Sequence, residues 1–285
     1  MPFNKTLSLQ ISFTVAAFII VLLAYSGSID GKGKEYTENS FNKALITFGI
    51  ARGLNGVISV AQGTEVAIHP AGFGVNFTPG EILDPINDLI EQFSWIMLAS
   101  SASLGIQRVF LNISGHWMTS LVLTLLLVCF VAFLWQDKLV SRETRNAIGR
   151  LALVALFVRF SIPVAAIGTE YLYHYFLDDQ YQESTVKLEN TRDKLVDLNE
   201  TRDEAQARGD NESVLDKARR MFESATASID INKRIEEYKM AATDASKYTI
   251  NLIVVFVIQT ILFPLLFLTA IYKFLKVASG KLIGL

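Results

Sequence analysis

The chain has 285 residues and a formal net charge of −2, and 51% of its residues are hydrophobic while 19% are charged. Its mean hydropathy of +0.34 is too high for a soluble protein with so many charges, so apolar and charged residues must be segregated along the chain. The near-neutral charge and the lack of a basic patch exclude a nucleic-acid-binding protein. The single cysteine, Cys129, lies in an apolar run, which excludes disulfides within the chain and predicts a packing residue.

Residues 1–25 are predicted to form the first transmembrane helix. Leu7–Tyr25 has no charged residue and is long enough to cross about 30 Å of hydrocarbon. The small residues at Ala24-Tyr25-Ser26 leave a cleaved signal peptide as the alternative. The apolar core is longer than that of a usual signal peptide, which favours a retained anchor.

Residues 26–116 are predicted to lie outside the cytoplasm, as a linker followed by amphipathic helices. Ser26–Ser40 is polar and glycine-rich, which predicts a flexible linker. Phe41–Gln62 has apolar residues at helical spacing, and its two basic residues, Lys43 and Arg52, favour an amphipathic helix over a span.

A loop and a second amphipathic helix are predicted to follow. His69–Pro79 contains two prolines and two glycines and is expected to be a loop. Thr78-Pro79-Gly80-Glu81 combines a capping box with a proline at the first helical position, so a helix is expected to start there. The acidic residues after this start predict a solvated face, with a cation site as the alternative: Asp84, Asp88 and Glu91.

Gln92–Gln107 is uncharged and leaves the number of spans open. A crossing here would move the basic loop 137–150 out of the cytoplasm unless another crossing compensated. The stretch is also rich in Ser and Ala, so its transfer into lipid is only modestly favourable. These two arguments predict a buried or interfacial helix.

Residues 117–173 are predicted to contain the second and third transmembrane helices, and residues 248–285 the fourth. The spans Trp117–Trp135, Leu151–Tyr173 and Tyr248–Tyr272 are bounded by the aromatic residues that prefer membrane interfaces, apart from the start at Leu151. Basic residues concentrate in the loop 137–150 and in the C-terminal tail: Lys138, Arg142, Arg145, Arg150, Lys273, Lys276 and Lys281. The positive-inside rule therefore places both termini and this loop in the cytoplasm.

Residues 174–247 are predicted to form an extracytoplasmic helical hairpin with a turn at Arg208-Gly209-Asp210-Asn211. Three leucines recur at heptad spacing, Leu188, Leu195 and Leu198, but Thr191 and Arg202 occupy other positions of the same pattern. This pattern predicts a weak two-stranded coiled coil. We expect the helices of residues 41–110 or neighbouring subunits to support it. The tip residues Arg208, Asp210 and Asn211 are candidates for a docking surface, with an ordinary solvated face as the alternative.

Two polar residues inside the predicted spans are candidate functional sites. Arg159 is ionisable, and burying it costs several kcal/mol, so it should either have a partner or extend toward the cytoplasmic headgroups about two turns away. Pro163 frees the carbonyl of Arg159 from its helical hydrogen bond. Gln259 and Pro264 repeat this pairing of a polar residue with a helix breaker.

The sequence thus predicts an all-α membrane protein with four transmembrane helices, amphipathic extracytoplasmic helices after the first and an antiparallel coiled-coil hairpin between the third and fourth. The histidines, His69, His116 and His174, are scattered, and no motif for a catalytic, metal or cofactor site is present. No small-molecule substrate is identified.

The leading functional interpretation is a non-enzymatic scaffold or assembly protein whose partners are the lipid bilayer and either copies of itself or a membrane-protein complex. The alternative is a subunit of an oligomeric channel or transporter. A membrane enzyme, with Asp84, Asp88 and Glu91 as acids, is a third and weaker interpretation. The absence of disulfides favours a bacterial inner membrane.

Overall fold

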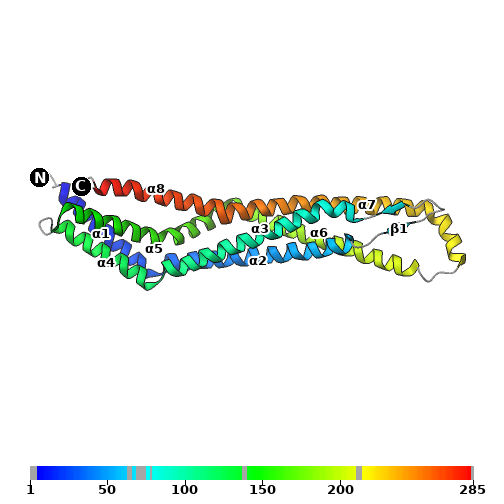
Figure 1. The fold of residues 1–285 in the computed structure, drawn as a ribbon, viewed down its shortest axis with the longest axis horizontal. Helices are drawn as coiled ribbons and strands as arrows, with labels where there is room; N and C mark the ends of the chain where they lie inside the picture. The colour runs from blue at the N-terminus through cyan, green and yellow to red at the C-terminus, as the bar shows by residue number, and fades with distance from the viewer. Residues whose placement is uncertain are drawn as a thin grey trace. The chain divides into compact units, whose positions relative to one another are not determined.

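The chain is almost entirely helical in the computed structural model, which describes the backbone of residues 5–62, 66–68, 75–77, 79–136, 140–209 and 214–283, and the side chains of residues 7–62, 81–136, 140–200 and 233–280 (Figure 1). The elements are α1 (Lys5–Ser26), α2 (Ser28–Gln62), β1 (Val66–Ile68), β2 (Val75–Phe77), α3 (Pro79–Ser114), α4 (Trp117–Trp135), α5 (Arg142–Phe176), α6 (Asp178–Gly209), α7 (Val214–Val257), the π-helix η1 (Ile258–Leu262) and α8 (Phe263–Ile283). The chain divides into unit 1, residues 1–42, 101–175 and 258–285, and unit 2, residues 43–100 and 176–257.

Six helical stretches among the described residues are long and apolar enough to cross a membrane. Four of them contain the predicted spans, and the other two are α2 and α3. In the most apolar 18-residue stretch of α1 only 6% of the residues are buried, and in that of α4 only 17%. Large apolar side chains therefore cover the outside of these two helices. Because water would not tolerate so much exposed apolar surface, these helices indicate an integral membrane protein.

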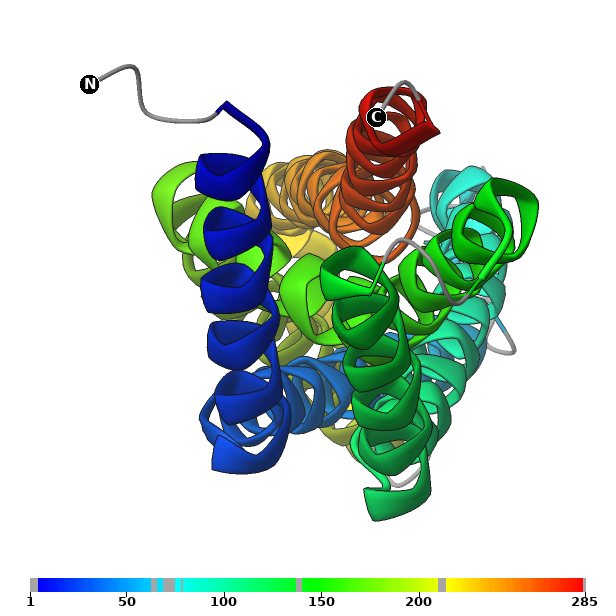
Figure 2. The ribbon, with the colours of Figure 1, turned by 90° about the vertical axis from the view of Figure 1, so that its left-hand side faces the viewer.

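Unit 1 contains an antiparallel pair of helices, α1 and α4, which we call the α1–α4 pair. At one end Gln10 Nε2 donates to the carbonyl of Leu134 at 2.7 Å, and at the other end Ser120 Oγ donates to the carbonyl of Ala24 at 3.1 Å. Between them the rings of Phe13 and Phe130 meet edge to face at 6.4 Å. α1 begins and α8 ends at the end of unit 1 where α5 begins (Figures 1 and 2).

The segment expected to be a flexible linker is instead the first part of α2, so that prediction was wrong. Residues 28–40 are helical although they include two glycines, each of which costs a helix about 1 kcal/mol. One face of this segment is buried, which offsets the cost: Asp30, Gly33, Tyr36, Thr37 and Ser40. A β-carbon added at Gly33 would lie 3.4 Å from the backbone of Pro163 in α5, so the glycine permits a close crossing of two helices.

Unit 2 is built on a buried stripe along α6. The stripe recurs every three or four residues, as expected for the inner face of a helix: Tyr181, Ser184, Leu188, Thr191, Leu195 and Asn199. The predicted inner positions of Leu188 and Leu195 are buried, and Thr191, which interrupts the leucines, is buried as well. Leu198 is only half-buried, and Asn199 takes the next inner position.

The stripe of α6 packs against α7 and also contacts α2. Asn199 Nδ2 donates to the carbonyl of Val57 in α2 at 3.2 Å, and its Oδ1 accepts from the hydroxyl of Tyr238 in α7 at 2.9 Å. Support from the helices of residues 41–110 was predicted, and these contacts with α2 confirm it.

The connection between α2 and α3 contains two short strands that the sequence did not predict. Val66 pairs with Phe77 and Ile68 with Val75 in an antiparallel ladder. The β-branched and aromatic residues at these positions favour extended pairing over the loop expected for residues 69–79. α3 then begins at Pro79, as the capping signal predicted.

A candidate functional site at Arg159

A sharp bend between α1 and α2 prepares the site. α1 ends at Ser26 and α2 starts at Ser28, and Gly27 between them has φ = +67°, in the left-handed region that favours glycine. Asp30 follows in the first turn of α2, where the helix dipole stabilises a negative charge. The bend thus places the last carbonyls of α1 beside a carboxylate of α2.

Arg159 of α5 binds both sides of this bend. Its Nη1 and Nη2 donate to the two carboxylate oxygens of Asp30 at 2.7 and 2.6 Å, a bidentate ion pair. Nη2 also donates to the carbonyl of Ala24 at 2.7 Å, and Nε donates to Ser120 Oγ of α4 at 3.0 Å. Four helices therefore contribute to one buried network, the Arg159 cluster (Ala24, Asp30, Ser120 and Arg159).

The break between α3 and α4 lies against the same cluster. α3 ends at Ser114 and α4 starts at Trp117, with His116 as its N-cap, whose Nδ1 accepts from the backbone amide of Met118. A β-carbon added at Gly115 would lie 3.3 Å from Cγ of Asp30. The two helix breaks, at Gly27 and at Gly115-His116, are therefore close neighbours.

The expectation that Arg159 extends to the cytoplasmic headgroups was wrong. Its side chain is 1% exposed and its bonding groups, Ala24 and Ser120, lie at the end of the α1–α4 pair opposite Gln10 and Leu134. The alternative reading, that Arg159 has a buried partner, is the correct one.

Asp30 was missed because a polar, glycine-rich stretch reads as a linker. The signal available in the sequence was the need of a buried arginine for a carboxylate. Asp30 is the first acid in the chain and lies just beyond the first span, so it was a natural candidate for that partner.

The second candidate, Gln259, is also buried in a polar network of unit 1. Its Nε2 donates to Tyr36 Oη at 3.0 Å and to Ser40 Oγ at 2.9 Å, both on the inner face of α2. Gln259 belongs to the π-helix η1, and Pro264 shortly after it lacks the amide that would bond the carbonyl of Thr260. Ser103 Oγ of α3 donates to that carbonyl at 3.3 Å instead.

The Arg159 cluster is a buried ion pair whose hydrogen bonds are made within the chain. The two charges cancel, and four hydrogen bonds from the guanidinium end on groups of this chain. The bidentate contact with the carboxylate fixes the orientation of the planar guanidinium. The geometry favours a structural function over proton transfer or nucleophilic chemistry.

The remaining sequence candidates do not join this cluster. Asp84, Asp88 and Glu91 are exposed, as predicted for a solvated face, and Asp84 accepts from Gln62 Nε2 at 2.7 Å. His174 Nε2 lies 3.9 Å from Glu170, one turn earlier on α5. Within the described part of the chain no three His, Cys, Asp or Glu side chains come together as metal ligands.

His69 and the predicted docking tip, Arg208, Asp210 and Asn211, lie outside the residues described at side-chain level.

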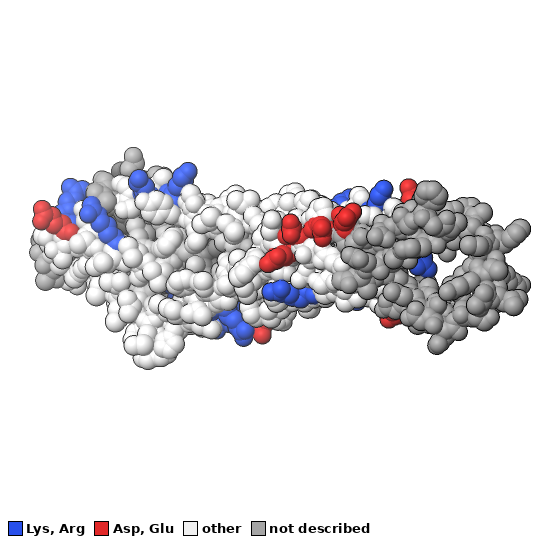
Figure 3. Space-filling view, turned by 45° about the vertical axis from the view of Figure 1, so that its right-hand side comes forward, with Lys and Arg blue, Asp and Glu red and all other residues white. Residues whose placement is uncertain are grey.

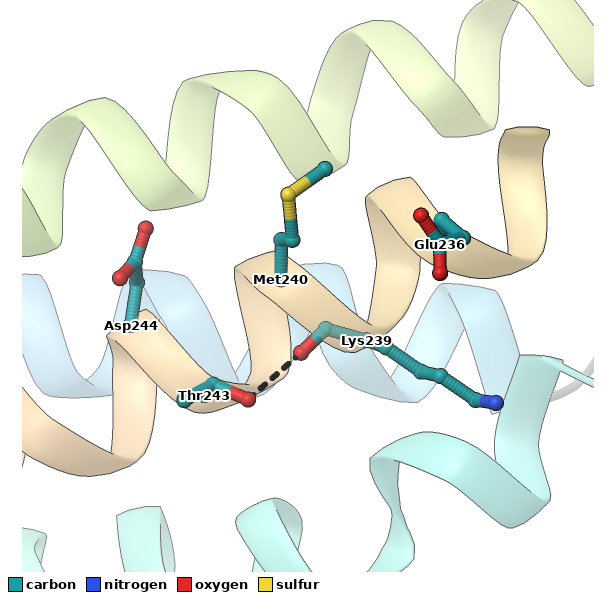
Figure 4. A pocket seen from close by; sticks show the side chains of 5 residues that line it. All are labelled: Glu236, Lys239, Met240, Thr243 and Asp244. Carbon is teal, nitrogen blue, oxygen red and sulfur yellow. Dashed lines mark hydrogen bonds between the residues drawn. The ribbon is translucent and has the colours of Figure 1, made fainter.

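A surface pocket lies along α7 in unit 2, away from these residues in sequence. It has a volume of about 310 Å³ and is lined by residues of α7 alone: Glu236, Lys239, Met240, Thr243 and Asp244 (Figure 4). The hydrogen bond drawn there, from Thr243 Oγ1 to the carbonyl of Lys239, is internal to the helix. The pocket is a hollow between neighbouring side chains, most of them exposed, and shows no converging set of ligand-binding groups.

Comparisons with protein-family models, with curated proteins and with solved structures find no significant match to this chain.

Proposed function

We propose that the chain is a non-enzymatic integral membrane scaffold or assembly protein, and that the α6–α7 hairpin projects outside the cytoplasm as a coiled coil for self-association or partner docking. The single observation that carries this proposal is the Arg159 cluster. The guanidinium of Arg159, inside a predicted span, donates hydrogen bonds to α1, α2 and α4 and so holds these helices together.

The distribution of charge supports the proposed orientation. Exposed Lys and Arg gather at the end of unit 1 where α5 begins and α8 ends: Arg142, Arg150, Lys273 and Lys276 (Figure 3). This is the pattern of a cytoplasmic face. The first part of α2 instead exposes charges of both signs, which favours a position outside the hydrocarbon and hence four spans: Lys32, Lys34, Glu35 and Glu38. We place both termini in the cytoplasm, most simply of a bacterium.

Accessibility labelling tests the orientation. In a Cys129→Ser background, an Asn211→Cys variant should react with a membrane-impermeant maleimide in intact cells. A Ser141→Cys variant, just before α5, should react only after permeabilisation. The opposite pattern would reverse the topology and remove the hairpin from the extracytoplasmic side.

Photo-crosslinking tests the scaffold function. A photoreactive residue at the exposed α6 positions Asn190 and Asp197 should yield one discrete adduct in cells, either with a second copy or with a partner. The same residue at Phe18, which is 64% exposed on α1, should yield no such adduct. Uniformly empty results from positions 190–235, or an identical adduct from Phe18, would contradict the proposal.

A channel or transporter subunit remains the second candidate, because unit 1 also buries polar side chains that have no hydrogen-bond partner among the described residues. Ser161 Oγ and Thr169 Oγ1 of α5 are buried without a hydrogen-bond partner among the described residues. Buried hydroxyls of this kind accompany water or solute in membrane proteins. Ion or solute flux through reconstituted protein, changed by Arg159→Leu, would support this alternative, and zero flux in the wild type would contradict it.

A further inference from the structure

The α1–α4 pair is internally tied along its length. Gln10 bonds to Leu134, Trp135 Nε1 donates to Thr14 Oγ1 at 3.1 Å, and Ser120 bonds to Ala24. These bonds lie near both ends of the two helices, so the pair is expected to move as one body.

The pair joins the rest of unit 1 through two breaks that lie side by side. One is the left-handed Gly27 between α1 and α2, and the other is Gly115-His116 between α3 and α4. The two breaks are close together, because Cγ of Asp30, in the first turn after Gly27, lies 3.3 Å from where a β-carbon of residue 115 would be. Two adjacent breaks of this kind can serve as a hinge, because a few residues at element ends can absorb a large change in φ and ψ.

Arg159 crosses this hinge. On one side, Asp30 of α2 holds the guanidinium in place through the bidentate pair. On the other side, Nη2 and Nε bind Ala24 of α1 and Ser120 of α4, which belong to the pair. Asp30 is thus the positioning residue, and the two bonds to Ala24 and Ser120 hold the pair against α5.

The pair has little apolar burial beside these polar bonds. Only 6% of the residues in the most apolar stretch of α1 and 17% of those in α4 are buried, so most of the surface of both helices is exposed. Swinging them within lipid therefore changes little buried area, and lipid supplies no hydrophobic force that would return them. At the far end, α5 meets the pair where Gly149 packs closely against the ring of Phe130, an apolar contact.

We propose that the α1–α4 pair is a hinged element of unit 1 that turns on Gly27 and Gly115-His116, and that Arg159, positioned by Asp30, is the latch that keeps it closed. Releasing the latch opens a lateral gap between the pair and α5. The proposal does not depend on the scaffold function, because it concerns a motion that either candidate function could use.

Distance measurements between spin labels test the latch. In a Cys129→Ser background in lipid nanodiscs, one label pair joins Phe18 of α1 to Val128 of α4, and a second joins Phe18 to Val154 of α5. All three positions are at least 59% exposed. The wild type should give a narrow distribution for both label pairs.

In Asp30→Asn, the Phe18–Val154 distribution should broaden and shift to longer distances while Phe18–Val128 stays narrow. Removing one partner of a buried ion pair should raise the open population by a factor on the order of 100. Asp30→Asn/Arg159→Met removes both charges, so that no unpaired charge is left buried, and should open the pair as well. Glu38→Gln, in an exposed ion pair with Arg108, is the matched control and should change neither distribution.

Two outcomes would overturn the proposal. If the Phe18–Val154 distribution of the double variant equals that of the wild type, Arg159 is no latch. If both label pairs broaden together, α1 and α4 do not move as one body, and the cluster only stabilises the fold.

Discussion

Units 1 and 2 differ in the charged side chains that they bury. Unit 1 buries Arg159, Asp30 and Gln259 beside apolar residues such as Leu111 and Leu123, and its helices α1 and α4 leave most of their apolar side chains exposed. The buried residues described in unit 2 are apolar or uncharged polar, and most of its charged residues are exposed. We attribute this difference to the solvent that each surface meets in the proposed orientation. Water drives apolar side chains together where a surface faces water, whereas helices in lipid gain nothing from that effect and are fixed by hydrogen bonds and close packing.

The largest effect should come from removing the charged centre of unit 1. Arg159→Leu leaves the carboxylate of Asp30, which is 12% exposed, without its partner, so unit 1 should lose about 3–5 kcal/mol. Denaturant titration in detergent measures this loss, followed by Trp117 and Trp135 in a Trp95→Phe background, because those two tryptophans belong to unit 1. Asp30→Leu/Arg159→Met should recover most of the loss. A single variant as stable as the wild type would show that the cluster does not hold unit 1 together.

Unit 2 should respond most to the loss of an apolar side chain. Leu195 is fully buried in the stripe of α6, so Leu195→Ala should cost about 2–5 kcal/mol through lost burial and the cavity that remains. Trp95 reports on unit 2 when Trp117 and Trp135 are replaced by Phe. Val186→Ala on the same helix is the control, since Val186 is 52% exposed and the change should stay within about 0.5 kcal/mol. Equal costs at both positions would refute the assigned stripe.

The sequence predicted the parts of both units that depend on periodicity and transfer energy. Helices over the apolar stretches, the start of α3 at Pro79 and the burial of Leu188 and Leu195 all follow from local pattern. The interaction of Arg159 with Asp30 was not predicted, because it joins residues 129 positions apart and pattern alone does not reveal such pairs. The helix over residues 28–40 was missed for the same reason, since buried contacts with α5 and η1 override the weak helix propensity of its glycines.

Close packing in unit 1 can be tested separately from its hydrogen bonds. A β-carbon at Gly168 of α5 would lie 2.5 Å from the ring of Phe267 in α8, so Gly168→Ala should force the helices apart. Overpacking costs about 1–3 kcal/mol, and the better helix propensity of alanine returns about 1 kcal/mol, which leaves a net loss of about 1 kcal/mol. Phe267→Leu should rescue the variant. Gly280→Ala, where no atom lies within 4 Å of the added carbon, should be neutral or stabilising, and a loss there equal to that at Gly168 would point to a backbone effect.

The smallest effect should come from the exposed ion pair of unit 1, which sharpens the comparison with Arg159. Arg108 Nη2 lies 3.5 Å from Glu38 Oε1, and the two side chains are 48% and 54% exposed. Because water screens both charges, Arg108→Gln should cost about 0–1 kcal/mol, and the cost should shrink further at high salt. The same titration with Trp117 and Trp135 as reporters measures it. A salt-insensitive loss comparable to that of Arg159→Leu would mean that this pair is shielded from water, and lipid or another copy of the chain would then have to cover the surface where α2 meets α3.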